Sequence, residues 1–157
     1  TGNMIARHNM RLVYGAGDVG LMGEVANSAQ SGKAEILGVI PEHLLQLEIG
    51  KQDIDSFIIT ENMHERKKIM LLNSDAFILL PGGFGSLEEF FELITWRQLG
   101  LHTKPCFIFN VEGYWDPLLK LIENQISEGF VLSNNTKFFT VVDRIEDLEE
   151  KLIQALS

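Results

Sequence analysis

A glycine-rich segment at residues 81–86 has the residue types and the spacing to bind a phosphate group. Its three glycines, Gly82, Gly83 and Gly85, lie within four positions and let the backbone approach an anion closely. We expect a helix to begin near Ser86, so that its free N–H groups and the positive end of its dipole face the same anion. The competing interpretation is a strand-to-helix turn that binds nothing, because short glycine motifs give many false positives.

A second glycine-rich segment, residues 15–20, reads Gly-Ala-Gly-Asp-Val-Gly and lies between an expected strand and an expected helix. This is the G-x-G-x-x-G pattern of dinucleotide-binding loops, in which Gly15 and Gly17 would approach the phosphates. Glu42 lies 22 residues past the last glycine, where such folds place the acid that binds a ribose hydroxyl. An NAD-dependent oxidoreductase is therefore one hypothesis.

Two basic residues, Arg66 and Lys67, lie near the start of another expected helix, directly after a strand. Ligands of open α/β sheets bind at the carboxyl ends of strands, so these cations could face an anionic substrate, although a solvated helix face is the alternative. The preceding His64 and Glu65 suggest a zinc-protease motif, but position 68 is lysine and the second histidine is missing. We therefore expect no metal there.

The loops after Tyr14, Thr60 and Leu80 would meet along one edge of a parallel sheet, which brings both glycine loops and the basic helix start together. Two anion-binding loops with an arginine between them suit a sugar phosphate or a mononucleotide. Glu89, one turn into the helix after the loop at 81–86, would add a carboxylate beside that ligand. This arrangement indicates glycosidic chemistry, because a nearby negative charge stabilises an oxocarbenium-like transition state.

Glu89 also has a possible structural role. The segment Ser86-Leu87-Glu88-Glu89 fits a capping box, in which Ser86 caps the helix and Glu89 returns a hydrogen bond to the Ser86 amide. A glutamine would serve equally well in a capping box but could not act as a base.

Apolar runs and helical periodicity predict alternating strands and helices along the whole chain. We expect strands at 11–14, 35–40, 57–60, 76–80, 105–110 and 138–142. Helices are expected to end near residue 10, to run from after Gly20 through Ser31, and to lie at 63–73, 86–99, 115–127 and 145–156. A long polar connection spans 42–56. The pattern predicts an α/β fold, a Rossmann-like doubly wound and mostly parallel sheet with helices on both faces. We expect residues 1–157 to form a single domain that lacks its first strand–helix unit, because the chain starts on the end of a helix.

The composition excludes several classes of protein. A net charge of −9 argues against a nucleic-acid surface, which is normally basic. The single cysteine, Cys106, lies in an apolar run and is expected to be buried, so no intrachain disulfide can form. No apolar run approaches the ~20 residues needed to span a membrane, and we expect a cytoplasmic protein with no membrane partner.

The motifs together resemble the Lonely-guy (LOG) family of cytokinin riboside 5′-monophosphate phosphoribohydrolases, which is often mislabelled as lysine decarboxylases. The family patterns P-G-G-x-G-T-x-x-E and M-x-x-R-K are matched at residues 81–89 and 63–67, with Ser86 in place of the threonine. The resemblance implies that Arg66 and Glu89 are the catalytic pair. It also implies that the substrate is bound by Gly15, Gly17, Met63, Lys67, Gly82, Gly83, Gly85 and Ser86.

The resemblance implies an N-glycosidase that hydrolyses a purine nucleoside 5′-monophosphate, such as AMP or a cytokinin ribotide, to the free base and ribose 5-phosphate. Water would be the second substrate, no cofactor would be needed, and the protein would be a homodimer with Trp96, Leu99 and Leu101 as candidate interface residues. Ala16 stands where the family has a glycine, and its methyl group would narrow the pocket. A non-catalytic nucleotide or cofactor carrier of the same fold is the alternative.

Overall fold

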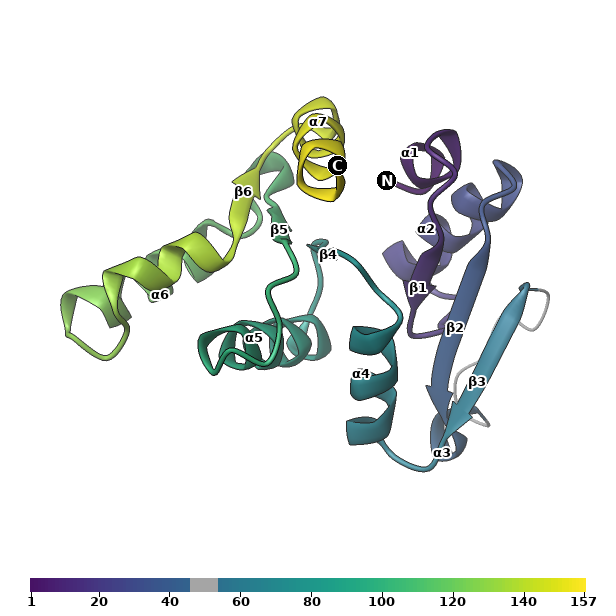
Figure 1. Cartoon of the computed structure of the whole chain (residues 1–157), viewed down its shortest axis with the longest axis horizontal. Helices are drawn as coiled ribbons and strands as arrows, with labels where there is room; N and C mark the ends of the chain where they lie inside the picture. Colours follow the sequence, from purple (N-terminus) through teal and green to yellow (C-terminus); the bar gives the residue numbers. More distant parts are fainter. Residues whose placement is uncertain (46–53) are drawn as a thin grey trace. The chain divides into compact units, whose positions relative to one another are not determined.

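The structure is a computed structural model that describes residues 1–45 and 54–157 of the chain (Figure 1). The chain divides into two compact units, Thr1–Ser74 and Asp75–Ser157, and each contains a parallel sheet of three strands. Strands alternate with helices in both units, which confirms the predicted α/β class and the parallel pairing.

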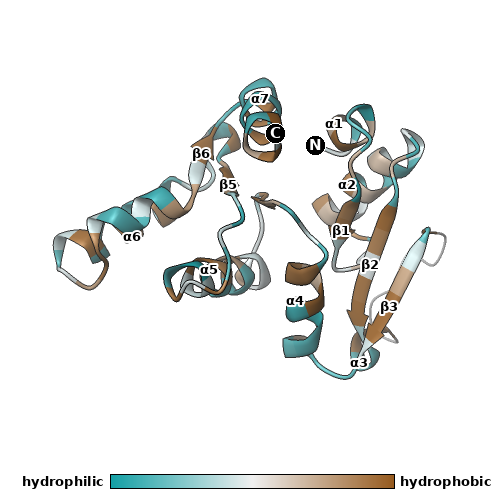
Figure 2. Ribbon diagram, viewed as in Figure 1, coloured by the Kyte–Doolittle hydropathy of each residue, from teal (hydrophilic) through white to brown (hydrophobic). Residues whose placement is uncertain are grey.

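The first unit is built around strand β2, which pairs with β1 on one side and with β3 on the other. Its elements are α1 (Gly2–Arg7), β1 (Leu12–Tyr14), α2 (Gly20–Ser31), β2 (Ile36–Pro41), α3 (Glu42–Leu45), β3 (Ser56–Thr60) and α4 (Met63–Leu72). Every residue of β2 is buried, as expected for an unbroken apolar run inside a parallel sheet (Figure 2). The carboxyl ends of β1 and β3 consequently lie at the same edge of this sheet.

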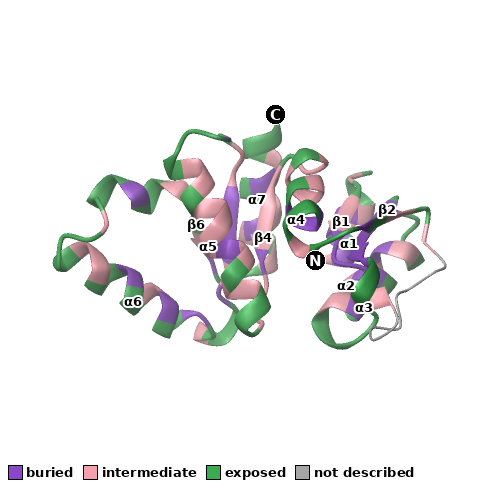
Figure 3. Cartoon of the chain, turned by 90° about the horizontal axis from the view of Figure 1, so that it is seen from below, coloured by how far each residue is buried: buried purple, intermediate pink, exposed green. Residues whose placement is uncertain are grey.

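The second unit repeats the alternation of strand and helix, with its strands in the order β4–β5–β6. Its elements are β4 (Phe77–Leu79), α5 (Phe84–Gln98), β5 (Cys106–Phe109), the 3-10 helix η1 (Val111–Gly113), α6 (Asp116–Ser127), the 3-10 helix η2 (Ser133–Phe138), β6 (Thr140–Val142) and α7 (Ile145–Leu156). Buried side chains from β4, α5, β5 and the start of α6 form its core (Figure 3). They are Leu79, Phe90, Ile108, Trp115, Leu118 and Ile122.

The structure corrects the predicted start of α5. The helix begins at Phe84 rather than near Ser86, and Gly83 is its N-cap. Glycine is an accepted N-cap residue, so the helix does not need the serine hydroxyl in that role. The predicted connection at 42–56 opens with the short helix α3, and its residues 46–53 lie outside the described part of the chain. Of the helices that the structure describes, none has the length and apolar character needed to cross a membrane.

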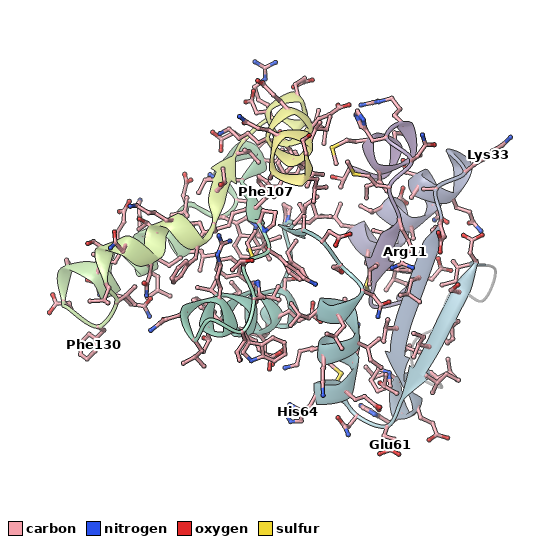
Figure 4. All side chains as sticks on the ribbon, in the orientation of Figure 1. Arg11, Lys33, Glu61, His64, Phe107 and Phe130 are labelled. Atoms are coloured by element: carbon pink, nitrogen blue, oxygen red, sulfur yellow. The ribbon has the colours of Figure 1, made fainter. Side chains whose placement is uncertain are left out.

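We predict that Phe90→Ala lowers the free energy of unfolding by about 3–5 kcal/mol, because it leaves a cavity in the core of the second unit. Phe90 is 4% exposed, and its ring packs edge-on against those of Phe91 and Phe139. Phe130→Ala is the matched control, since this phenylalanine is 86% exposed and projects from the protein (Figure 4). Urea denaturation followed by circular dichroism measures both variants. Equal, small losses would show that Phe90 is not a core residue.

Candidate functional site

Arg66 is a buried cation in the first unit, with only 7% of the residue exposed. It extends from α4, the helix that follows β3, to the loop that follows β1. Its Nη2 donates a hydrogen bond of 3.2 Å to the carbonyl oxygen of Gly15, and its Nη1 lies 3.6 Å from the sulfur of Met63. The structure thus brings together Gly15, Met63 and Arg66, three of the predicted site residues.

Gly15 leaves open the space that the Arg66 guanidinium occupies. A Cβ built on Gly15 would overlap the Arg66 guanidinium. The predicted role of Gly15 was a close approach to phosphate. The structure shows that the glycine also makes room for a side chain of the protein itself.

The Arg66 guanidinium retains hydrogen-bonding capacity. Neither of its two hydrogen-bond partners carries a charge, and its Nε has no partner among the described residues. Buried polar groups are nearly always hydrogen-bonded, so a buried donor without a partner indicates either a missing ligand or a destabilising feature kept for function. An anion bound here would supply both the acceptor and the counter-charge.

The first turn of α4 is fixed by an N-terminal cap. Asn62 Oδ1 accepts a hydrogen bond of 2.9 Å from the Glu65 amide, and Glu65 Oε2 accepts one of 2.8 Å from the Glu61 amide. Glu65 is therefore a capping residue, and His64 beside it is exposed (Figure 4). Among the described residues, no group of three or more His, Cys, Asp or Glu could hold a metal. The cap sets the direction of α4 and so the position of Arg66.

The glycine loop of the second unit leads directly into α5. The first intrahelical hydrogen bond runs from the Leu87 amide to the Gly83 carbonyl, so the amides of the preceding turn have no acceptor within the helix. A Cβ built on Gly82 would collide with the Ser86 hydroxyl, which places these two predicted site residues side by side. The N-terminus of this helix has the geometry of an anion site.

Glu89 is half-buried on α5, one residue before the core residue Phe90. Successive helical residues are turned by about 100°, so Glu89 lies on one flank of Phe90 and Phe91 lies on the other. Phe91 lines an apolar pocket of about 430 Å³ that is also lined by residues of α6. The predicted capping box is wrong, because Gly83 caps the helix and Ser86 is its third residue. A capping hydrogen bond to the Ser86 amide therefore does not account for a glutamate at position 89.

Ala16 and Cys106 are both structural. Ala16 is fully buried at a positive φ of 61°, and its methyl group lies 3.0 Å from where a Cβ of Gly38 on β2 would be. It therefore packs against the sheet, which corrects the expectation that it narrows the pocket.

Cys106 is buried as predicted, and burial raises the pKa of its thiol more than the nearby Arg97 lowers it. The thiol is protonated and unreactive at neutral pH.

Lys67 is also buried, whereas Gly83 and Gly85 are exposed at the start of α5. Gly17 is buried in the loop after β1. The first unit therefore joins two of the three predicted loops through the contact between Arg66 and Gly15. It stays a prediction that these two loops lie close to the loop at 81–86, and that Arg66 lies close to Glu89.

Sequence comparisons identify the family. A family profile described as a possible lysine decarboxylase matches residues 22–152. A probable cytokinin riboside 5′-monophosphate phosphoribohydrolase of Oryza sativa subsp. japonica is 42% identical over 153 residues, which are 98% of this chain and 69% of that protein. A cytokinin riboside 5′-monophosphate phosphoribohydrolase of Arabidopsis thaliana is 41% identical over 96% of this chain and 70% of its own length. The chain belongs to the Lonely-guy family.

Solved structures confirm the fold of this Lonely-guy protein. The molybdenum cofactor binding protein of Rippkaea orientalis matches with a TM-score of 0.74 at 20% identity, over 99% of this chain and 83% of that one. The molybdenum cofactor carrier protein of Chlamydomonas reinhardtii matches with a TM-score of 0.70 at 19% identity, over 99% and 82% of the two chains. At such low identity, the likeness concerns the fold alone.

We predict that Arg66→Met raises the free energy of unfolding by about 1 kcal/mol, because the cost of burying this cation exceeds the gain from its hydrogen bond to a carbonyl. Methionine fills most of the same space without the charge. Lys68→Met on the exposed side of the same helix is the control. Differential scanning calorimetry of the wild type and the two variants measures the change in stability. A clear loss of stability in Arg66→Met alone would mean that the arginine serves the fold.

Proposed function

We propose that this Lonely-guy protein hydrolyses the N-glycosidic bond of a purine nucleoside 5′-monophosphate, releasing the base and ribose 5-phosphate. The observation that carries the proposal is the buried Arg66 guanidinium, whose Nε has no partner among the described residues and whose position depends on Gly15. Such a group suits an anionic substrate. The names of relatives that are 41–42% identical support the same activity.

The proposed substrate is AMP or a cytokinin ribotide, with its 5′-phosphate at the start of α5. Four residues would hold the phosphate through backbone amides and a hydroxyl group. They are Gly82, Gly83, Gly85 and Ser86. From the first unit, Gly15, Gly17, Met63 and Lys67 would complete the substrate site beside Arg66. Nucleosides without the phosphate should be poor substrates, because they lack this anchor.

Glu89 and Arg66 would carry the chemistry. As the bond to the base breaks, positive charge develops at the anomeric carbon, and the Glu89 carboxylate would stabilise that charge and direct or deprotonate the attacking water. Arg66 would hold the substrate or assist the departure of the base. The reaction as proposed uses water and needs no cofactor. We place it in the cytoplasm.

A nucleotide or cofactor carrier of the same fold is the alternative function. A carrier would bind its ligand and release it unchanged, whereas the proposed enzyme would convert AMP to adenine and ribose 5-phosphate. Incubation with a panel of nucleoside monophosphates, followed by chromatography of the products, separates the two functions. Binding without any release of base would favour the carrier.

We predict that Glu89→Gln lowers the rate of base release by at least ~100-fold, because glutamine has neither a basic nor a negatively charged group. Its thermal stability should stay close to that of the wild type, since the amide has nearly the same shape. Glu88→Gln, which changes the exposed neighbouring carboxylate, should keep normal activity. Release of adenine from AMP is the assay. Near-normal turnover by Glu89→Gln would remove Glu89 from the mechanism.

We further propose a homodimer, in line with the exposed Leu99 and Leu101 that follow α5 and the half-buried Trp96 on it. Multi-angle light scattering is expected to give twice the chain mass of 17.7 kDa. Leu99→Glu should shift the protein toward the monomer, because it places a charge in an apolar interface. A mass of 17.7 kDa for the wild type at every concentration would contradict the dimer.

A further inference from the structure

Tyr114 makes a contact that sequence analysis did not single out. Its hydroxyl group donates a hydrogen bond of 2.8 Å to the carbonyl oxygen of Gly82. Tyr114 lies in the loop between β5 and α6, and Gly82 lies in the loop between β4 and α5, so the bond joins two neighbouring loops of the second unit. The tyrosine is about half-exposed, and its ring also lines the apolar pocket between α5 and α6.

This hydrogen bond fixes the orientation of one amide in the glycine loop. The described residues contain no cis peptide bond, and in a trans peptide the C=O and N–H groups point in opposite directions. The carbonyl of Gly82 is turned toward Tyr114, so the N–H of Gly83 in the same peptide unit is turned away from it. That N–H immediately precedes the free amides of Phe84, Gly85 and Ser86.

Tyr114 is itself held in place by a buried asparagine. Asn110 Oδ1 accepts a hydrogen bond of 2.7 Å from the amide of Trp115, and Asn110 Nδ2 donates one of 2.9 Å to Asp116 Oδ1. Gly113, just before the tyrosine, has a positive φ of 72°, which favours glycine. These contacts hold the backbone on both sides of Tyr114, and from this position its hydroxyl group reaches Gly82.

We propose that Tyr114 is a positioning residue for anion binding, which holds the Gly82–Gly83 peptide so that the Gly83 amide faces the phosphate. A peptide between two glycines has many accessible orientations, and binding must otherwise select the one that presents the N–H. The hydrogen bond makes that selection before the ligand arrives. The inference rests on the proposed function, because the ligand is the 5′-phosphate of the nucleotide substrate.

Tyr114→Phe tests the proposal, because it removes the hydroxyl group and keeps the ring in the pocket. One neutral hydrogen bond contributes about 0.5–1.5 kcal/mol, so we expect the affinity for AMP and for inorganic phosphate to fall about three- to tenfold. Isothermal titration calorimetry on the full chain measures both ligands. The KM for AMP should rise by the same factor with little change in kcat, and the weak binding of adenosine should stay unchanged.

Thr95→Val is the matched control, since it deletes another hydroxyl-to-carbonyl hydrogen bond, to Phe91 within α5, far along the helix from the loop. It should leave phosphate affinity unchanged. Wild-type affinity for phosphate in Tyr114→Phe would overturn the proposal, as would an equal loss for adenosine. If the wild type releases no base and Tyr114→Phe still weakens phosphate binding, the proposed enzymatic activity would be refuted and the positioning role of Tyr114 supported. A wild type that binds neither phosphate nor AMP would overturn both.

Discussion

The burial of one guanidinium against a residue without a side chain is the constraint around which the candidate site of the first unit is built. Arg66 and Gly15 are 51 residues apart, and they meet because β1 and β3 flank β2 in parallel and end at the same edge. The parallel sheet thus brings the Arg66 cation into contact with the glycine loop that follows β1. Burial in turn strengthens every electrostatic interaction that the cation can make, because the surroundings have a lower dielectric constant than water.

The second unit uses its glycine loop in a comparable way. Gly82 leaves room for the Ser86 hydroxyl group, and its carbonyl oxygen accepts the hydrogen bond from Tyr114. In both units, then, a glycine of the loop is contacted closely by a side chain from elsewhere in the same unit. The glycines therefore serve the internal geometry of the loops as well as the approach of a ligand. At Gly15 and Gly82, a larger residue would displace the Arg66 guanidinium or the Ser86 hydroxyl group from its present place.

Much of the fold could be predicted, because the chain alternates apolar runs with helical periodicity and parallel strands leave their following loops at a common edge. The cluster of Gly15 and Arg66 follows from that rule. The start of α5 could not be placed, since Gly83 caps the helix through its backbone and leaves no side-chain signal. The capping signal at Asn62 and Glu65 was present in the sequence but was not recognised.

Tyr114 could not be found from the sequence, because its bond to Gly82 spans 32 residues and depends on how two loops lie beside each other. Its place in the structure has a consequence for ligand design. The apolar pocket of about 430 Å³ is lined by both Tyr114 and the Gly82–Gly83 backbone. An uncharged compound that fills it would contact the Gly82–Gly83 backbone and Tyr114 at once, without imitating a nucleotide.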